Sequence, residues 1–295
     1  MAYRIMTRRR IVEHIAAQFE SQLGYALDLD HPETFNEKLQ WLKLNYRDPL
    51  MTRCTDKIGV RDYVADTAGR EYLTEMLAVF DSAADIDFEA LPSRFVLKTT
   101  NGSGTNIFCP DKDELDITQA RAQLASWLRP SASQYNLGYE WGYKNVVPRS
   151  LCEEYLGDAG TIKDYKFFCF AGEPRLIYVS TEHGSKADID MDFMDVEWRR
   201  LPYRRTSYAW HDAVPEHPKH LDVMVDLARR LAQPFPFVRV DLYEIDSRVL
   251  FSELTFYPAN GTGAFENLEH DREIGAMLPL PRKRHAARPM ELQRI

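Results

Sequence analysis

The stretch FVLKTTNGSGTN, residues 95–106, sets the first constraint on the fold. The apolar run 95–97 is typical of the end of a buried strand, and Lys98 follows it directly. After the lysine comes a turn of small polar residues that contains Gly102, Ser103 and Gly104. A lysine at the end of a buried strand and before a glycine-rich turn needs a physical reason.

Two interpretations of this stretch are open. Glycines permit positive φ angles and close approach of the backbone, and successive N–H groups in such a turn can bind an anion such as phosphate. Lys98 would add a positive charge there. Alternatively, the stretch is a hairpin turn whose lysine extends to solvent. It is not a P-loop, because Lys98 precedes the glycines.

Composition narrows the classes of function. The 295 residues are 44% hydrophobic, which is enough for one large domain or two modest ones. The net charge of −8 disfavours a nucleic-acid surface but allows a small anionic ligand. No apolar run has the length of a transmembrane segment. The four cysteines contain no CxxC pair, so we expect free thiols in a cytoplasmic protein.

Hydrophobic periodicity predicts helices first and strands later in the chain. A helix is expected in the stretch 31–46, where Thr34 and Glu37 fit a capping box and Phe35, Leu39 and Leu42 follow on one helical face. Further predicted helices cover 11–19, 55–66 with Lys57 in its first turn, 111–129 and 217–233. Predicted strands cover 150–156, a hairpin over 164–180 with its turn at 172–174, and a second hairpin over 237–258 with its turn at 246–247. The aromatic stretch 134–150 is expected to pack as core or lid, and the basic residues 282–295 as a loose tail.

Two carboxylates interrupt the apolar strands of the last hairpin. Asp241 lies in VRVDLYE and Glu253 in LFSELTF, and each is costly to bury unless it is paired or bound to metal. Arg239 precedes Asp241 by two residues, so both side chains point to the same face of the strand. The group could be an ion-pair network, or it could hold Mg²⁺ together with substrate phosphates. Taken with Lys98 and the glycine turn, it favours the metal interpretation.

In this order of motifs the sequence resembles the TupA-like branch of the ATP-grasp enzymes, from about Phe35 to Pro281. The resemblance implies phosphate contacts from Lys57, Lys98 and Lys166, and a flexible loop, Thr99–Asn106 with Gly102, Ser103 and Gly104, above the phosphates. It implies an adenine-binding hinge of Glu153, Glu154, Tyr155 and Leu156, and a ribose contact from Asp164. It implies catalytic roles for Arg239 and Lys98, and metal ligation by Asp241 and Glu253.

Two positions and the length of the N-terminal region depart from the pattern of that family. Thr255 stands where many members have asparagine, so Thr255 would ligate weakly, Asn260 would complete the metal site instead, or one metal would be held less tightly. Glu154 replaces a lysine found in the hinge of some members. Only about 55 residues precede Lys57, and the large N-terminal domain that shapes the substrate pocket in other families is missing.

The resemblance implies an α+β ATP-grasp fold, in which two α/β lobes with antiparallel sheets enclose ATP beside a short helical N-terminal segment. We expect that segment over 1–54, the lobes over 55–149 and 150–281, and the tail over 282–295. The implied cofactors are ATP and Mg²⁺. The implied reaction joins a carboxylate to an amine through an acylphosphate, attaching an amino acid to a surface polysaccharide that contains uronic acids, or to its precursor. A kinase acting on a hydroxyl, a glycosyltransferase and a non-catalytic nucleotide-binding module are the alternatives.

Overall fold

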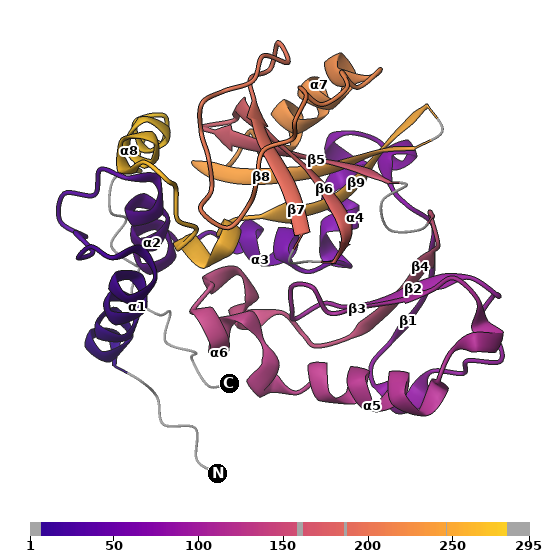
Figure 1. Ribbon diagram of the computed structural model, residues 1–295. Helices are drawn as coiled ribbons and strands as arrows, with labels where there is room; N and C mark the ends of the chain where they lie inside the picture. The colour runs from indigo at the N-terminus through magenta and orange to yellow at the C-terminus, as the bar shows by residue number, and fades with distance from the viewer. Residues whose placement is uncertain (1–6, 158–161, 186–187, 246, 282–295) are drawn as a thin grey trace.

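Two antiparallel sheets face each other across the middle of the molecule (Figure 1). The computed structural model describes residues 7–157, 162–185, 188–245 and 247–281. The smaller sheet has the order β1 (Met76–Phe80), β4 (Ser150–Glu154), β2 (Phe95–Thr99), β3 (Asn106–Cys109). The larger has the order β7 (Asp188–Met194), β6 (Glu173–Ser185), β5 (Lys163–Phe170), β8 (Phe237–Ile245), β9 (Arg248–Thr255). The predicted α+β class with antiparallel sheets is confirmed.

The smaller sheet is covered on one face by α5 (Ile117–Trp127). Leu97 of β2 and Leu124 of α5 are fully buried in their shared core. The predicted helix over 111–129 was too long. A single 3₁₀ turn, Lys112–Glu114, comes first, and α5 begins only after Asp116, whose side chain accepts a hydrogen bond from the Gln119 N–H at 2.8 Å. An N-cap of this kind fixes where a helix starts.

The larger sheet is covered by α7 (Leu221–Ala232). The apolar residues of α7 recur at helical spacing and are buried against the sheet: Leu221, Met224, Leu227, Ala228 and Leu231. The helix begins at Leu221 rather than at residue 217 as predicted, and at its start the His220 N–H donates to Glu244 on β8 at 2.9 Å. The turn between β5 and β6 was predicted at 172–174. In the structure it consists of Ala171 and Gly172, with φ of 48° and 86°, and Pro174 lies within β6.

The predicted helix over 55–66 is broken in the structure. Helix α3 (Pro49–Thr55) ends before Lys57, and α4 (Gly59–Thr67) starts after it. The Asp56 side chain accepts the Ile58 N–H at 3.0 Å, which closes a turn between the two helices. Lys57 therefore stands in that turn, not in the first turn of a helix.

Both α3 and α4 pack into the core of the larger sheet. Met51, Val60 and Val64 are buried there together with residues of β5 and β8. The stretch 55–67, which the sequence assigned to the first lobe, thus shares the hydrophobic core of the second. We propose that the first lobe consists of the smaller sheet with α5.

Three helices form a layer beside the sheets: α1 (Arg8–Leu23), α2 (Phe35–Asn45) and α8 (Leu268–Ala276). The predicted capping box of α2 is present, with Thr34 and Glu37 bonded reciprocally. Asn36 of α2 donates to Asp271 of α8 at 2.7 Å, which ties the two helices together in the interior. The predicted basic tail lies outside the described residues.

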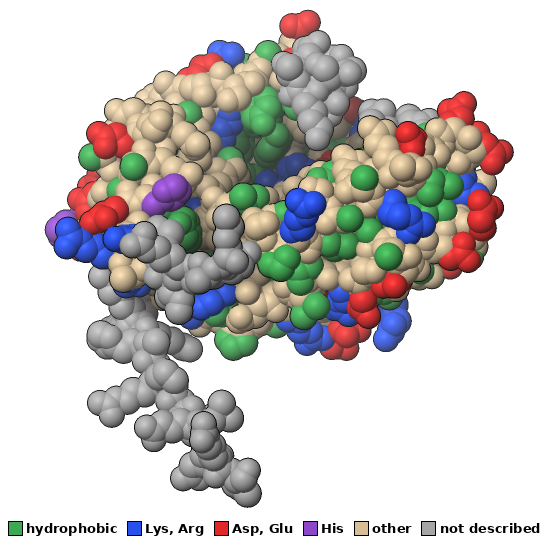
Figure 2. All heavy atoms as spheres, turned by 90° about the horizontal axis from the view of Figure 1, so that it is seen from below, with side chains coloured by type: hydrophobic (Ala, Val, Ile, Leu, Met, Phe, Trp, Pro, Cys, Tyr) green, Lys and Arg blue, Asp and Glu red, His purple; other side chains and the backbone are tan. Residues whose placement is uncertain are grey.

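The four cysteines are free and buried, as the sequence predicts. Within the described ranges, no helix combines the length and the apolar character that crossing a membrane requires. The face shown in Figure 2 is hollowed at its upper side, where hydrophobic and basic side chains are visible in the hollow.

The close contact of α8 with the start of α2 generates a prediction. A Cβ atom added at Gly275 would meet backbone atoms of Glu33 and Thr34 and lie 2.7 Å from the Phe35 nitrogen. Gly275→Ala should therefore destabilise the protein by about 1–3 kcal/mol, as overpacking typically does. Urea unfolding measures the change, and Ala276→Ser at the exposed neighbouring position should stay within about 0.5 kcal/mol of wild type. Equal stability of both variants would contradict this packing.

Candidate functional site

A cavity of about 620 Å³ lies between the two sheets. Most of the residues predicted for an ATP site line it: Lys57, Lys98, Ser103, Gly104, Glu153, Glu154, Leu156, Asp164, Lys166, Asp241 and Glu253. They come from the α3–α4 turn, the β2–β3 loop and strands β2, β4, β5, β8 and β9. The fold thus brings together residues that are up to about 200 positions apart in the chain.

Four other predicted residues do not line the cavity directly. Gly102 contributes its carbonyl, which accepts a hydrogen bond from Lys57 Nζ at 2.8 Å. Arg239 and Thr255 lie behind the carboxylates of Asp241 and Glu253. The ring of Tyr155 packs on the guanidinium of Arg94, 4.5 Å from ring centroid to Cζ. A contact of Tyr155 with a nucleotide would therefore have to come from its backbone.

Lys98 points into the cavity and is paired there. Its Nζ lies 2.6 Å from Oε2 of Glu153 on the neighbouring strand β4. The other Glu153 oxygen accepts hydrogen bonds from Arg61 at 2.8 Å and Thr74 at 3.1 Å. Burial alone would raise the pKa of Glu153, but Lys98 and Arg61 outweigh it and hold that pKa below its usual value. Both groups of the Lys98–Glu153 pair are therefore charged at neutral pH.

The glycine-rich loop is the connection of the β2–β3 hairpin. The loop is closed at its base by Thr99 and Thr105, whose hydroxyls lie 2.6 Å apart. Gly104 has a φ of 68°, a conformation that favours glycine. The hairpin interpretation of this stretch is thus correct for the backbone, but its lysine does not extend to solvent. Lys98 and the loop residues Ser103 and Gly104 face the same cavity.

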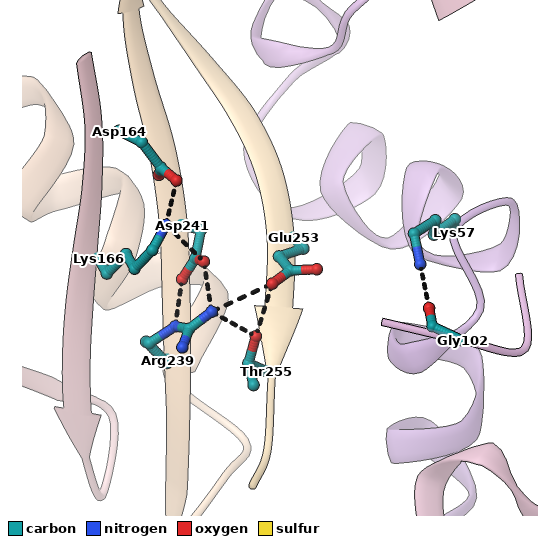
Figure 3. Close-up of polar contacts among 8 residues, drawn as sticks. All are labelled: Lys57, Gly102, Asp164, Lys166, Arg239, Asp241, Glu253 and Thr255. Carbon is teal, nitrogen blue, oxygen red and sulfur yellow. Dashed lines mark hydrogen bonds and ion pairs between the residues drawn. The ribbon is translucent and has the colours of Figure 1, made fainter. Parts of the chain in front are cut away.

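A second group of charges forms a line across the larger sheet (Figure 3). Lys166 on β5 is the direct cross-strand partner of Asp241 on β8, and Asp241 is the direct partner of Glu253 on β9. Arg239 and Thr255 are the next such pair on the same face. The register shifts just beyond Asp241, where Ser252 has no partner on β8. A β-bulge of this kind turns a side chain locally and is frequent beside active sites. We call Lys166, Arg239, Asp241, Glu253 and Thr255 the charge ladder.

Asp241 is the centre of the charge ladder and is 1% exposed. Arg239 binds both of its oxygens, at 2.7 and 2.6 Å, and Lys166 Nζ lies 3.3 Å from one of them. Arg239 also donates to Glu253 at 3.1 Å and to Thr255 at 3.0 Å. Burial would lower the pKa of Arg239, but Asp241 and Glu253 raise it far above its usual value. The ion-pair network that the sequence allowed is therefore present.

The same residues are compatible with a metal ion. One Glu253 oxygen is bound by Arg239 and Thr255, whereas the other accepts no hydrogen bond from any residue of the described ranges and points away from the ladder (Figure 3). Mg²⁺ is typically bound by one or two carboxylates together with substrate phosphates. Asp241 and Glu253 fit that donor set. In the described part of the chain no three or more His, Cys, Asp and Glu side chains form a metal-binding cluster by themselves.

Asn260 accepts hydrogen bonds from Lys43 of α2 rather than from a residue of the charge ladder. Its side-chain oxygen accepts a hydrogen bond from Lys43 of α2 at 2.6 Å, and its carbonyl accepts another at 2.8 Å. Glu140 neighbours Lys43. Burial raises the pKa of Glu140 to about 7, against the pull of Lys43, and lowers the pKa of Lys43 to about 8. Of the two residues predicted as alternatives, Thr255 contacts Glu253 directly, whereas Asn260 is bound by Lys43. Metal ligation by either residue stays a prediction.

Several cavity residues were not foreseen from the sequence. Arg61 holds Glu153, and the aromatic residues Tyr143, Tyr208 and Tyr243 line the cavity. Arg61 follows Lys57 by four positions, a spacing that places side chains on one face of a helix and could have drawn attention to it. Tyr143 belongs to the 3₁₀ segment Trp141–Asn145, which follows α6 (Gln134–Gly138) in the aromatic stretch. No local pattern distinguishes Tyr143 from the packing aromatics around it.

Comparison with known families identifies the kind of protein to which this geometry belongs. A sequence model described as TupA-like ATPgrasp matches residues 37–279, which is most of the chain. The chain belongs to the TupA-like ATP-grasp family. The resemblance seen in the sequence is thereby confirmed, and so is the ATP-grasp fold that it implied. The comparison with curated proteins gave no match.

Solved structures of ATP-grasp proteins also resemble this TupA-like chain. A D-alanine–D-alanine ligase from Helicobacter pylori is 13% identical, with 83% of this chain and 69% of that chain covered and a TM-score of 0.45. The corresponding ligase from Bacillus anthracis, complexed with ATP, is 14% identical, with coverage of 76% and 61% and a TM-score of 0.45. N5-carboxyaminoimidazole synthase from Aspergillus clavatus is 12% identical, with coverage of 82% and 54% and a TM-score of 0.38. The chain spans less than two thirds of the last two.

The Lys98–Glu153 pair of this ATP-grasp chain predicts a pH-dependent stability. Because the folded state lowers the pKa of Glu153, the pair stabilises the protein above the usual carboxyl pKa of 4.5, and this stabilisation is lost as the pH falls through the lowered value. Glu153→Gln should therefore cost up to about 3–5 kcal/mol at pH 7, and the gap to wild type should close below about pH 4.5.

Urea unfolding at a series of pH values measures that gap. A double-mutant cycle with Lys98→Met provides the control, because the coupling between the two substitutions should be largest at pH 7 and fall with the gap. A gap that stays constant or widens in acid would show that Glu153 does not act through its charge.

Proposed function

We propose that the protein is an ATP-dependent carboxylate–amine ligase that forms an amide through an acylphosphate and releases ADP. The observation that carries the proposal is the arrangement of charge around the cavity. The ammonium groups of Lys57, Lys98 and Lys166 line the same cavity as the Asp241 and Glu253 carboxylates, in a chain of the TupA-like ATP-grasp family. A triphosphate needs such cations, and Mg²⁺ needs such carboxylates.

The cavity also suits a nucleoside. Its apolar lining includes Val96, Phe108, Leu156, Phe251 and Leu254, and apolar walls with a few fixed polar groups are typical of such ligand sites. Glu154, at the end of β4, is held by the Glu75 N–H at 2.8 Å. We propose that the backbone of 153–156 binds the adenine there.

Asp164 is the proposed ribose contact. One of its oxygens is bound by Lys166. The other is buried and accepts no hydrogen bond within the described ranges, and a buried acceptor left without a partner is costly. A ribose hydroxyl would supply the missing donor.

In the proposed reaction, a carboxylate oxygen of the acceptor attacks the γ-phosphorus of ATP and the bond to ADP breaks. The nitrogen of an amine then attacks the acyl carbon, the bond to the phosphate oxygen breaks, and the amine loses a proton. Asp241 and Glu253 would hold Mg²⁺, which would neutralise phosphate charge. Lys57, Lys98 and Lys166 position the phosphates, and Arg239 stabilises the negative charge on the transferred group. Such catalysis consists mainly of positioning and charge stabilisation.

For the substrates we propose an amino acid and a surface polysaccharide that contains uronic acids, or its precursor, on the basis of the family resemblance. The reaction uses ATP, and the four cysteines of the structure are free thiols. Both features are typical of cytoplasmic proteins, and we propose that location.

The products test this mechanism most sharply. We predict that ATP, Mg²⁺, a panel of uronic and amino acids and hydroxylamine yield ADP, phosphate and a hydroxamate, because hydroxylamine attacks acylphosphates in place of the natural amine. Mass spectrometry identifies nucleotide and acid. Lys98→Ala should lower turnover about 10²–10³-fold, as loss of a preorganised charge contact typically does. Lys163→Ala is the matched control, since Lys163 is a half-exposed lysine of β5 paired with Glu216.

Two results would contradict the ligase. AMP as the nucleotide product would show that the carboxylate is adenylated. A stable phosphate ester on a sugar hydroxyl, without hydroxamate, would show the kinase reaction instead.

A further inference from the structure

Arg205 is a buried guanidinium for which the described residues provide no carboxylate at ion-pair distance. It lies in the segment between β7 and α7 and is 8% exposed. Its guanidinium donates to the Gly263 carbonyl and stacks on the Phe265 ring, 3.8 Å from Cζ to the ring centroid. Gly263 leaves it the necessary space, because a Cβ there would lie 2.9 Å from Arg205 Cζ.

Other arginines with little exposure in this chain are paired with acids. Arg61 binds Glu153 at 2.8 Å, Arg200 binds Asp192 at 3.0 Å and Arg239 binds Asp241 at 2.6 Å. Burying a cation without a counter-charge is costly, and burial accordingly lowers the pKa of Arg205. Asp271 is the acid that acts on Arg205 from nearby, but its oxygens accept hydrogen bonds from Asn36 and Tyr25.

The surroundings of Arg205 connect it to the cavity. The Tyr208 N–H donates to the Arg205 carbonyl at 3.4 Å. The Phe265 ring beneath the guanidinium lies 6.0 Å from the Phe193 ring, which in turn lies 5.9 Å from the Tyr178 ring. Tyr208 lines the cavity. Tyr178 on β6 is the direct cross-strand partner of Lys166, so it extends the charge ladder by one strand on the same face of the sheet. Along that line Glu253 stands at one end, on β9, and Tyr178 at the other, on β6. Arg205 therefore lies beside the end of the ladder that is farther from Glu253.

We propose that Arg205, together with the hydroxyls of Tyr178 and Tyr208, binds the carboxylate of the acceptor. The inference rests on the proposed function and names the residues that select its acid substrate. An arginine fork matches a carboxylate in two parallel hydrogen bonds, and the two hydroxyls can donate to the same oxygens. The substrate carboxylate supplies the counter-charge that the protein lacks here. Lys166, on the strand next to that of Tyr178, adjoins this group, and Arg239 lies one strand farther along the sheet.

A structural role for Arg205 makes a different prediction. If the guanidinium only joined residues 205 and 263, its removal would lower stability and leave ligand binding unchanged. If it is an unpaired ligand group, Arg205→Met should retain or raise the melting temperature of the ligand-free protein, because methionine keeps the contact with Phe265 and removes the uncompensated charge. Such a gain is typical of substitutions in sites built for binding.

The experiment measures the melting temperature in three proteins: wild type, Arg205→Met and the control Arg204→Met. Arg204 is the neighbouring arginine, is 39% exposed and lies 3.5 Å from Glu266. Each protein is saturated with ADP and Mg²⁺ and titrated with sodium glucuronate, galacturonate, acetate or L-glutamate. Sodium chloride and glucose serve as the ionic and neutral controls. A ligand that binds only the folded state raises the melting temperature by mass action.

We expect at least one carboxylate to stabilise wild type and Arg204→Met, and to bind Arg205→Met about 10-fold or more weakly. Arg205→Lys, which keeps the charge but not the fork, should lie between them and serves in place of Arg205→Met if that variant does not fold. A carboxylate response that survives in Arg205→Met, or none in wild type, would overturn the proposal. The shift caused by ADP and Mg²⁺ alone should be equal in all three proteins. Its absence would count against the proposed nucleotide site and leave the result for Arg205 standing.

Discussion

The burial of Asp241 is the constraint on which the site depends. A carboxylate in the middle of an apolar sheet is tolerable only if cations surround it, and the antiparallel register of β5, β8 and β9 provides them. Lys166 faces Asp241 from the neighbouring strand β5, and Arg239 contacts Asp241 from two positions earlier on the same strand, β8. A slip of one residue in this register would turn the whole charge ladder to the opposite face. Fold and site are therefore specified by the same pairings.

The smaller sheet repeats this arrangement with a different pair. Lys98 and Glu153 are neighbours because β2 and β4 are paired. Arg61 of α4, which packs against the larger sheet, also binds Glu153. Each sheet thus presents buried, compensated charge to the cavity between them. A polyanion bound in the cavity would take over cations that the protein otherwise neutralises with its own carboxylates. Arg205 is the exception, because no carboxylate of the described residues lies at ion-pair distance to neutralise its charge.

Much of this arrangement could be predicted from the sequence, because it follows from strand periodicity. Residues two apart on a strand share a face, which is enough to group Arg239 with Asp241. The apolar run 95–97 and the glycine-rich turn that follows are enough to predict that Lys98 stands near the end of a strand. The remainder depends on contacts between distant segments. Nothing local indicates that Asp56 closes a turn that interrupts the helix at Lys57, that Lys43 of α2 captures Asn260, or that Glu153 is the partner of Lys98. No sequence pattern singled out Arg205, because the lack of a carboxylate partner becomes visible only when the positions of the surrounding residues are known.

Calorimetric titration of ATP, with and without Mg²⁺, tests whether this cavity binds ATP together with Mg²⁺. We expect wild type to bind ATP and Mg²⁺ to tighten that binding. Lys98→Met should weaken ATP binding about 10-fold or more under both conditions. Glu253→Gln should abolish the tightening by Mg²⁺ but leave ATP binding without Mg²⁺ unchanged. Glu244→Gln is the control and should behave as wild type, because Glu244 of β8 is paired with His220 and does not line the cavity. Binding of a nucleotide sugar but not of ATP, or ATP binding that none of these substitutions alters, would contradict an ATP site with Mg²⁺ in this cavity.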